Sequence, residues 1–359
     1  MNTLYLLVFV LALSTALVLM PLAVYLSKRY AIVSRPGGRR REAQPIPKLG
    51  GLAMYGSFVL TVLVAQFLPV PRQDPNEIIR LIGLLAGSTF IFVASLLDDR
   101  YEFSALPQGI AQIIAAGIAV TFLIFIETVN NPFTGQQTDP WPHVVTVTLS
   151  MFWLGLMMNT VNFLDGVDGL AGGVALIAGA MLFINSAFIV QPAQTSVSLL
   201  PLALMGASLG FLLYNFYPAR VYMGSNGAFF LGYALGTLSI IGGAKMATIL
   251  LVMGLPLMDL AWQVVNRLRA GKNPMVGDRG HAHFRLLDMG FSQRQIALTY
   301  YLFCAFFGVL TLVITSQLFK FVALGVMLAL IAIGFVLLAR RRQGSSPVSS
   351  ESAGGESSG

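Results

Sequence analysis

The chain has little charge and almost no cysteine. Charged residues make up only 10% of its 359 positions, whereas hydrophobic residues make up 56%. Soluble domains carry about 25% charged residues, so the composition excludes an ordinary soluble protein and predicts an integral membrane protein. Because Cys304 is the only cysteine, an intramolecular disulfide and a cysteine-based metal site are excluded as well.

Apolar segments long enough to cross a bilayer recur along most of the chain. Since about 20 apolar residues span the hydrocarbon core, the sequence predicts an all-α protein with about eleven transmembrane helices. The segments are roughly 3–27, 50–70, 79–97, 107–127, 144–163, 169–190, 197–216, 227–243, 246–265, 296–315 and 319–339. The first lacks a positively charged leader and exceeds a signal-peptide core in length, which favours an uncleaved helix. The membrane domain is predicted to cover residues 1–342, followed by a disordered, Ser- and Gly-rich cytoplasmic tail over 343–359.

The net charge of +7 follows membrane topology, and its distribution argues against a nucleic-acid partner. With the N-terminus outside, the predicted cytoplasmic loops and tail contain every Lys and Arg except Arg72, Arg80, Lys245 and Lys320. This distribution obeys the positive-inside rule. The chain is therefore predicted to have an external N-terminus and a cytoplasmic C-terminus, and to take any water-soluble substrate from the cytoplasm.

Two adjacent carboxylates, Asp98 and Asp99, follow the predicted span 79–97, and Glu102 completes a DDxxE pattern. Negative charge at the C-terminal end of a helix opposes the helix dipole, so a purely structural end would favour Lys or Arg. A solvated helix end is the alternative interpretation. Grouped carboxylates instead suit Mg²⁺, which prefers oxygen ligands and bridges to substrate phosphates.

A second polar cluster ends the predicted span 144–163, where Asn159, Asn162, Asp165 and Asp168 recur every third residue. Such steps rotate around a helix, so only neighbouring pairs can share a face, and the glycines that follow predict a helix end near Asp165. Hydrogen bonds between helices would explain the two Asn residues but not two carboxylates, which are costly at membrane depth. The two clusters together predict one site for a divalent metal and a phosphate-rich ligand.

Cations and histidines gather in two further segments that are predicted to be cytoplasmic. The loop 271–285 contains Arg279, His281, His283 and Arg285. Metal binding by the two histidines is one interpretation and plain positive-inside topology is another. Donation to phosphate or sugar oxygens fits better, because cations surround the histidines. The segment 39–51, which includes Lys48, could bind a lipid phosphate or anionic headgroups.

In this order, the segments resemble the polyprenyl-phosphate N-acetylhexosamine-1-phosphate transferase family. The matching pieces are Pro47–Gly51, Asp98–Leu106, Asn159–Gly169, Asn215–Gly224, Pro256–Asp259 and Asp278–His283. The resemblance implies transfer of a sugar 1-phosphate from a UDP-amino sugar to undecaprenyl phosphate or another polyprenyl phosphate, with release of UMP, to initiate a cell-envelope polysaccharide. It also implies Mg²⁺ (or Mn²⁺), a bacterial inner membrane, a cytoplasmic active site and a homodimer. The histidine loop is more similar to the branch that uses UDP-GlcNAc than to the muramoyl-pentapeptide branch.

We hypothesise direct phosphoryl transfer, with the following roles for individual residues. Asp98 or Asp99 would assist the lipid phosphate as nucleophile, and Asp165 and Asp168 would hold the metal, so these four are the predicted catalytic residues. A two-step route through an aspartyl phosphate would use the same residues. The predicted substrate-binding residues are Lys48, Asn159, Asn162, Asn215, Arg279, His281, His283 and Arg285.

Four positions depart from the family pattern. Ser225 stands where an aspartate linked to metal binding is expected, and Glu102, Phe284 and Gln108 replace an Asp, a His and a Lys. A hydroxyl is a poorer Mg²⁺ ligand than a carboxylate, so a catalytically impaired member that binds or regulates is one alternative function. An ion-coupled transporter is another, but it would place acids near the bilayer midplane, whereas these acids cluster at cytoplasmic helix ends.

Overall fold

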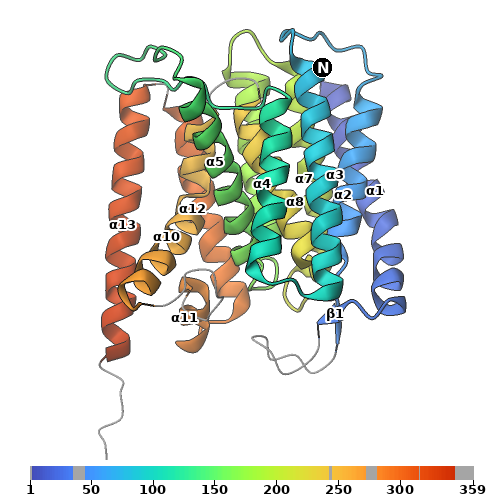
Figure 1. Cartoon of the computed structure of the whole chain (residues 1–359), viewed down its shortest axis with the longest axis vertical. Helices are drawn as coiled ribbons and strands as arrows, with labels where there is room; N and C mark the ends of the chain where they lie inside the picture. The colour runs from blue at the N-terminus through green and yellow to red at the C-terminus, as the bar shows by residue number, and fades with distance from the viewer. Residues whose placement is uncertain (1, 35–44, 242–244, 272–280, 315, 344–359) are drawn as a thin grey trace, which may run out of the picture.

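The computed structural model describes residues 2–34, 45–241, 245–271, 281–314 and 316–343, and it is a bundle of helices that run mostly along one axis (Figure 1). The helices are α1 Asn2–Arg29, α2 Gly50–Ala65, α3 Glu77–Tyr101, α4 Ala105–Thr121, α5 His143–Leu164, α6 Leu170–Ile184 with its π-helical extension η1 Asn185–Ile189, α7 Thr195–Asn215, α8 Gly224–Ile240, α9 Met246–Val252, α10 Gly254–Arg269, α11 Ala282–Asp288, α12 Gln293–Val313 and α13 Gln317–Gln343. Apolar segments become helices because a helix satisfies all its backbone hydrogen bonds internally.

The helical prediction is confirmed, with one small addition. Two-residue strands, β1 Val33–Ser34 and β2 Ile46–Pro47, pair antiparallel between α1 and α2, with Val33 opposite Pro47. The all-α prediction missed this pair. Strands so short have no periodicity that a sequence could reveal.

Fewer helices reach membrane-spanning length than the eleven predicted. Among the described residues, 7 helices are long and apolar enough to cross a membrane, or 8 if the bent pair α9–α10 forms one span. The predicted segments 50–70, 107–127 and 227–243 correspond to α2, α4 and α8, which have 16, 17 and 17 residues. Helices of that length rise about 25 Å, which is less than a hydrocarbon core of about 30 Å. The number eleven and the orientation therefore stay predictions.

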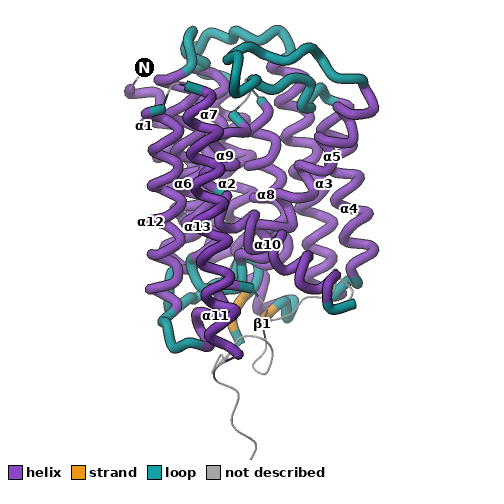
Figure 2. The backbone as a smooth tube through the Cα atoms, turned by 90° about the vertical axis from the view of Figure 1, so that its left-hand side faces the viewer, coloured by secondary structure: helices purple, strands orange, loops and turns teal. Residues whose placement is uncertain are grey.

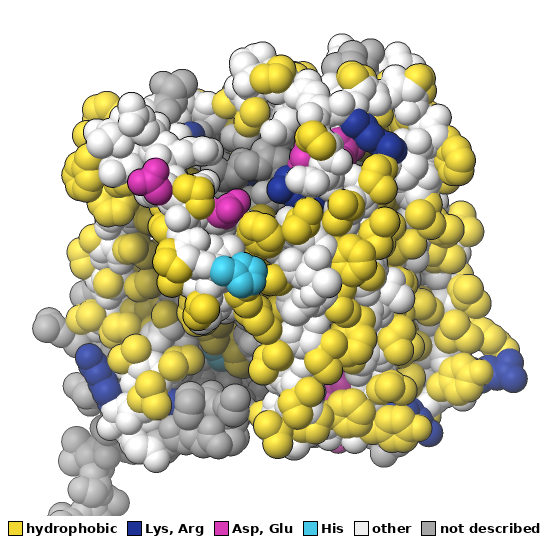
Figure 3. All heavy atoms as spheres, turned by 45° about the horizontal axis from the view of Figure 1, so that its top comes forward, with side chains coloured by type: hydrophobic (Ala, Val, Ile, Leu, Met, Phe, Trp, Pro, Cys, Tyr) yellow, Lys and Arg dark blue, Asp and Glu magenta, His cyan; other side chains and the backbone are white. Residues whose placement is uncertain are grey.

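The outer surface of the bundle suits lipid rather than water. Figure 3 shows hydrophobic side chains over most of the flank that faces the viewer. Large apolar residues such as Val18, Val144 and Leu302 are more than two-thirds exposed, at 74%, 76% and 74%. Continuous apolar surface on this scale marks a membrane or partner contact, so the chain is a multi-pass membrane protein.

Helix α8 lies inside the bundle, and nearly all of its side chains are buried. It packs against α3 and α5. At Gly232 any side chain would collide with the backbone of Met158 in α5. Small residues allow such close approach between membrane helices, so α8 is held directly against the two helices that end in the acidic clusters.

The segments with polar motifs meet at one end of the molecule. Helix α11 and the strands lie together at the lower end of the bundle, away from the long loops at the other end (Figure 2). A bend of 72° separates α9 from α10. The break falls at Met253, and Pro256 lies in the first turn of α10, where its missing N–H costs no helical hydrogen bond. The bend inclines α10 away from the bundle axis, so that its lower end lies beside α13 (Figure 1).

Candidate active site

A cavity of about 720 Å³ opens among the ends of α3, α5, α8 and α11. It is lined by Ser34, Lys48, Asp98, Asp99, Glu102, Phe103, Gln108, Asn162, Phe163, Asp165, Gly166, Tyr222, Gly224, Ser225, His281 and Phe284. Six predicted site residues are among them, namely Lys48, Asp98, Asp99, Asn162, Asp165 and His281. Residues from five distant parts of the sequence therefore share one chamber.

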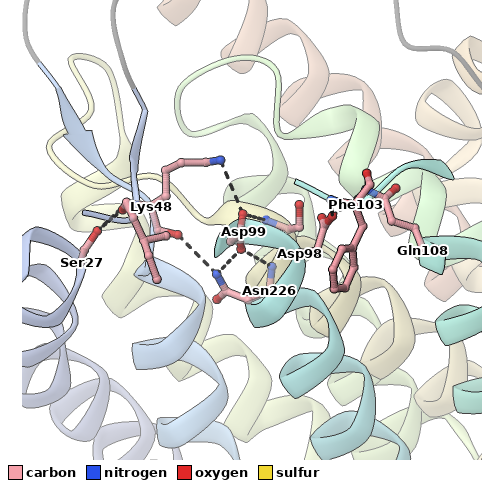
Figure 4. A network of polar contacts seen from close by, with 9 residues as sticks. Ser27, Lys48, Asp98, Asp99, Phe103, Gln108 and Asn226 are labelled. Atoms are coloured by element: carbon pink, nitrogen blue, oxygen red, sulfur yellow. Dashed lines mark hydrogen bonds and ion pairs between the residues drawn. The ribbon is translucent and has the colours of Figure 1, made fainter. Parts of the chain in front are cut away.

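Asp99 joins the end of α3 to the start of α8 (Figure 4). Its Oδ1 accepts a hydrogen bond from the backbone N–H of Ser225, and its Oδ2 accepts from the backbone N–H and the side-chain Nδ2 of Asn226, at 3.0, 2.9 and 2.6 Å. A helix N-terminus presents unpaired N–H groups and partial positive charge, which favour a carboxylate. The Asp99 side chain is fully buried, so its oxygens are occupied by structural bonds.

Lys48 reaches the same carboxylate from the segment between β2 and α2. Its Nζ lies 3.6 Å from Asp99 Oδ1, and the side chain is 31% exposed. Its segment is held by main-chain bonds from Tyr222 N–H to Pro47 O and from Gly50 N–H to Tyr222 O, at 2.7 and 2.9 Å. Lys48 is thus a cation with one side on Asp99 and the other open to the cavity.

Gly224 makes this junction possible. Its φ is +74°, and a Cβ there would collide with the backbone oxygen of Lys48 and lie 2.7 Å from Asp99 Oδ2. Only glycine adopts that backbone conformation without steric cost and leaves room for both neighbours.

Asp98 has different partners from Asp99. Its Oδ1 accepts from the backbone N–H of Phe103 and from Gln108 Nε2, both at 2.9 Å. Glu102 ends α3 in the left-handed conformation and turns the chain so that Phe103 can donate. Among the described residues none donates to Oδ2 of Asp98, which lines the cavity. Asp98 is therefore the carboxylate of the pair that can meet a substrate.

The second acidic cluster is divided by the end of α5. Asn162 and Asp165 line the cavity. Asp168 is not among the lining residues, and its Oδ2 accepts from the backbone N–H of Ala219 at 3.0 Å. Its own N–H donates to Gln293 Oε1 at 2.9 Å. Asp168 thus ties the turn after α5 to two other segments, and its predicted part in metal binding stays a prediction.

Two of the predicted Asn residues make structural contacts. Asn215 accepts from the N–H of Gly169 and donates to Val221 O, both at 2.9 Å, and is buried. Asn159 donates to Gln112 Oε1 in α4 at 2.6 Å. Neither lines the cavity. The interhelical hydrogen bond considered for the Asn pair is therefore present at Asn159, whereas Asn162 faces the chamber.

The histidine segment enters the site through α11. His281 lines the cavity, whereas His283 is buried behind it with 1% exposure. Both Nδ1 atoms face Asp259 of α10, His281 at 3.4 Å and His283 at 3.5 Å from its Oδ2. Arg285 lies in α11 but does not line the cavity. Arg279 lies outside the described residues.

Sequence reasoning missed Asp259 as a site residue and Asn226 and Gln112 altogether. A carboxylate inside a membrane helix is costly unless paired, so Asp259 carried a usable signal. Asn226 and Gln112 carried none, because a single buried amide in an apolar helix does not reveal its partner.

The cavity offers a sparse donor set for a metal. Among the described residues no group of three or more His, Cys, Asp or Glu side chains is close enough to hold an ion. Mg²⁺ keeps several waters and is commonly bound by one or two carboxylates together with substrate phosphates. Asp98 and Asp165 line the same chamber and fit that pattern. Ser225 also lines it and contributes only a neutral hydroxyl.

Comparison with known proteins identifies the family. Residues 81–243 match the family model of glycosyl transferase family 4. The chain is 32% identical to decaprenyl-phosphate N-acetylglucosaminephosphotransferase of Mycolicibacterium smegmatis over 299 residues, which cover 77% of this chain and 74% of the relative. It is 27% identical to the probable undecaprenyl-phosphate N-acetylglucosaminyl 1-phosphate transferase of Bacillus subtilis, over 86% of this chain and 84% of the relative.

A third relative has the same kind of name. The undecaprenyl-phosphate alpha-N-acetylglucosaminyl 1-phosphate transferase of Escherichia coli K12 is 25% identical over 87% of this chain and 83% of its own length. The matches extend well beyond the acidic clusters to most of the membrane domain. The chain belongs to glycosyl transferase family 4, among the polyprenyl-phosphate N-acetylglucosamine-1-phosphate transferases.

Proposed function

We propose that this enzyme transfers N-acetylglucosamine 1-phosphate from UDP-GlcNAc to undecaprenyl phosphate, or another polyprenyl phosphate, at the cytoplasmic face of a bacterial inner membrane. An oxygen of the lipid phosphate attacks the phosphorus that carries the sugar. The bond from that phosphorus to the bridging oxygen breaks, and UMP leaves with the bridging oxygen. The products are a lipid-linked diphosphate sugar and UMP. The lipid-linked sugar is the first intermediate of a cell-envelope polysaccharide, and UMP is the by-product.

One observation carries the proposal. A cation, a carboxylate and an imidazole from distant segments line a single cavity at one end of a membrane bundle, as Lys48, Asp98 and His281 do. Two phosphorylated substrates, one lipid and one soluble, can meet only at such a boundary. Phosphoryl transfer depends mainly on positioning and charge stabilisation, and these side chains supply both. The relatives' names support GlcNAc as the sugar.

The geometry favours a division of labour within the acidic pair. Oδ2 of Asp98 is available to accept a proton from the lipid phosphate or to orient it, whereas Asp99 is engaged with α8 and Lys48. The ammonium group of Lys48 would then contact phosphate oxygens on its side that faces away from Asp99. Asn162 would donate a hydrogen bond to the sugar or to the diphosphate. Asp165 would hold bound Mg²⁺ or Mn²⁺, which would neutralise charge on the diphosphate.

Ser225 supports a second candidate function. It lines the same cavity as Asp98 and Asp165 without adding charge, which weakens any cation site there. A member with little transfer activity would bind UDP-GlcNAc and release no UMP. An ion-coupled transporter has less support, because the acids that line the cavity sit at helix ends rather than midway along a helix.

Purified protein in detergent tests the proposal through release of UMP from UDP-GlcNAc. Undecaprenyl phosphate and Mg²⁺ are each included or omitted, and Asp98→Asn is the matched inactive variant. We expect release that needs both substrates and the metal. Binding of UDP-GlcNAc without release would support the impaired alternative, and neither binding nor release would overturn the proposal.

A further inference from the structure

A buried carboxylate outside the cavity connects α10 to the histidine segment. Asp259 is 3% exposed. Its Oδ1 accepts from the backbone N–H of Ala282 at 2.9 Å, which caps the start of α11. Its Oδ2 faces the Nδ1 atoms of both His281 and His283. One side chain therefore meets two imidazoles and the backbone between them.

The chemistry of these partners sets the protonation of the rings. An ionised carboxylate can only accept hydrogen bonds, so a ring nitrogen that faces it is stabilised when it carries a proton. A ring whose Nδ1 carries its proton keeps Nε2 for a second partner. Of the two histidines, His281 is the one that lines the cavity.

Neighbouring rings hold His281 in this position. The ring centroid of Phe163 lies 4.8 Å from that of His281, and the His283 ring stacks on it at 5.4 Å with an interplanar angle of 13°. His283 in turn occupies the space beside Gly166, where a Cβ would lie 2.7 Å from its Nε2. His283 is therefore a wall of the site, and His281 is the member that reaches the chamber.

We propose that Asp259 is a positioning residue of the active site, which holds His281 through Nδ1 so that Nε2 is presented to the phosphate groups in the cavity. The arrangement of a carboxylate, an imidazole and a reacting group is a general means of orienting a histidine. Its catalytic consequence rests on the function proposed above. The orientation of the rings does not depend on that function.

The location of Asp259 gives α10 a role in the site. Asp259 lies in the second turn of α10, just after the 72° bend. The inclination of α10 therefore determines where the carboxylate lies, and the carboxylate determines where His281 lies. A simpler view is that Asp259 only caps α11, in which case the charge on its Oδ2 would not matter to the imidazoles.

Asp259→Asn separates the two views. The amide oxygen can still accept from the N–H of Ala282, so the cap is kept, but the amide NH₂ then faces both Nδ1 atoms. Those nitrogens must become acceptors, which moves the ring proton to Nε2. Asp288→Asn, at an exposed carboxylate of the same short helix, is the matched control.

Nitrogen NMR of histidine-labelled protein reads the ring protons directly, because the chain has 3 histidines. The third, His143, is exposed at the start of α5 and serves as an internal reference. We expect His281 and His283 to be protonated at Nδ1 in the wild type and to lose that proton in Asp259→Asn, while His143 does not change. Unprotonated Nδ1 in the wild type, or no change in the variant, would overturn the positioning role.

Turnover tests the catalytic consequence by a double-variant cycle. Asp259→Asn and His281→Gln should each lower kcat by roughly 100-fold or more, with a smaller change in KM, and Asp288→Asn should not. If Asp259 acts through His281, the double variant is no slower than His281→Gln alone. If the fold-losses in kcat of the two single variants multiply in the double variant, that route is refuted, even if each single variant is impaired. A wild type without turnover would count against the proposed function, and the NMR result would still decide the ring arrangement.

Discussion

The adjacent carboxylates Asp98 and Asp99 should respond in opposite ways to the same substitution. In Asp98→Asn the amide oxygen can replace Oδ1 and keep both of its hydrogen bonds, while the amide NH₂ replaces the oxygen that lines the cavity. In Asp99→Asn the amide oxygen can keep both bonds from Asn226, but the NH₂ then faces the N–H of Ser225 and Nζ of Lys48.

The structure sets the size of the difference. Loss of a hydrogen bond to a charged group costs about 1.5–3 kcal/mol, and the partly exposed Lys48 adds at most about 1 kcal/mol. Asp99→Asn should therefore destabilise the fold by about 3 kcal/mol. An unfolding entropy of about 2.1 cal/mol/K per residue converts this into a fall of about 4 °C in Tm. Asp98→Asn should keep its Tm but lose at least about 100-fold in turnover.

Cys304 supplies the stability assay. It is the only cysteine and is completely buried in α12, so a fluorogenic thiol reagent reports unfolding without any added label. UMP release measures turnover on the same samples. Equal Tm losses in the two variants, or a larger loss in Asp98→Asn, would refute the separation of a structural from a substrate-facing carboxylate.

Three further substitutions test other parts of the site. Ser225→Asp adds a fifth carboxylate to the cavity, so the Mg²⁺ concentration for half-maximal UMP release should fall about tenfold or more. An unchanged metal titration would contradict the assigned cavity position. Gly224→Ala forces an alanine into a positive φ and against a backbone oxygen, so Tm should fall, whereas the control Gly117→Ala has nothing within 4 Å of its Cβ and should leave Tm unchanged or raised. Asn159→Ala should cost about 0.6–1.7 kcal/mol of stability with little loss of kcat. Asn162→Ala should lower kcat with little loss of stability. The same loss of kcat in both variants would show that the helix contact is not the role of Asn159.

The sequence predicted the helices because apolar length is a strong signal in a membrane protein. It was less informative about how the helices end. The segment 246–265 reads as one apolar run, but it breaks at Met253, and hydropathy does not register a bend. The helices α2 and α4 end at Ala65 and Thr121, before the predicted ends at 70 and 127, whereas α8 has the predicted length but begins three residues earlier, at Gly224.

The site was predictable in its members and less so in their orientation. Asp98 and Asp165 share a cavity. The sequence indicated this, because both acidic clusters end spans that are predicted to cross the membrane in the same direction. Nothing in the sequence separates Asp165 from Asp168, since both follow the same helix. The difference arises because the chain turns between them and Asp168 meets Ala219. The position of Asp259 next to the two histidines depends likewise on a bend that the sequence does not reveal.

The long sequence separation within the cavity has a consequence for biogenesis. Lys48, Asp99 and Ser225 come together only after α8 has been synthesised, and His281 follows α10 later still. Chains emerge from the ribosome N-terminus first, so a nascent chain that stops between Asp168 and His281 would contain both acidic clusters but no imidazole in the cavity. If the enzyme acts as proposed, such an incomplete product would lack the imidazole that meets the phosphate groups, so the site is complete only after α11 has been synthesised.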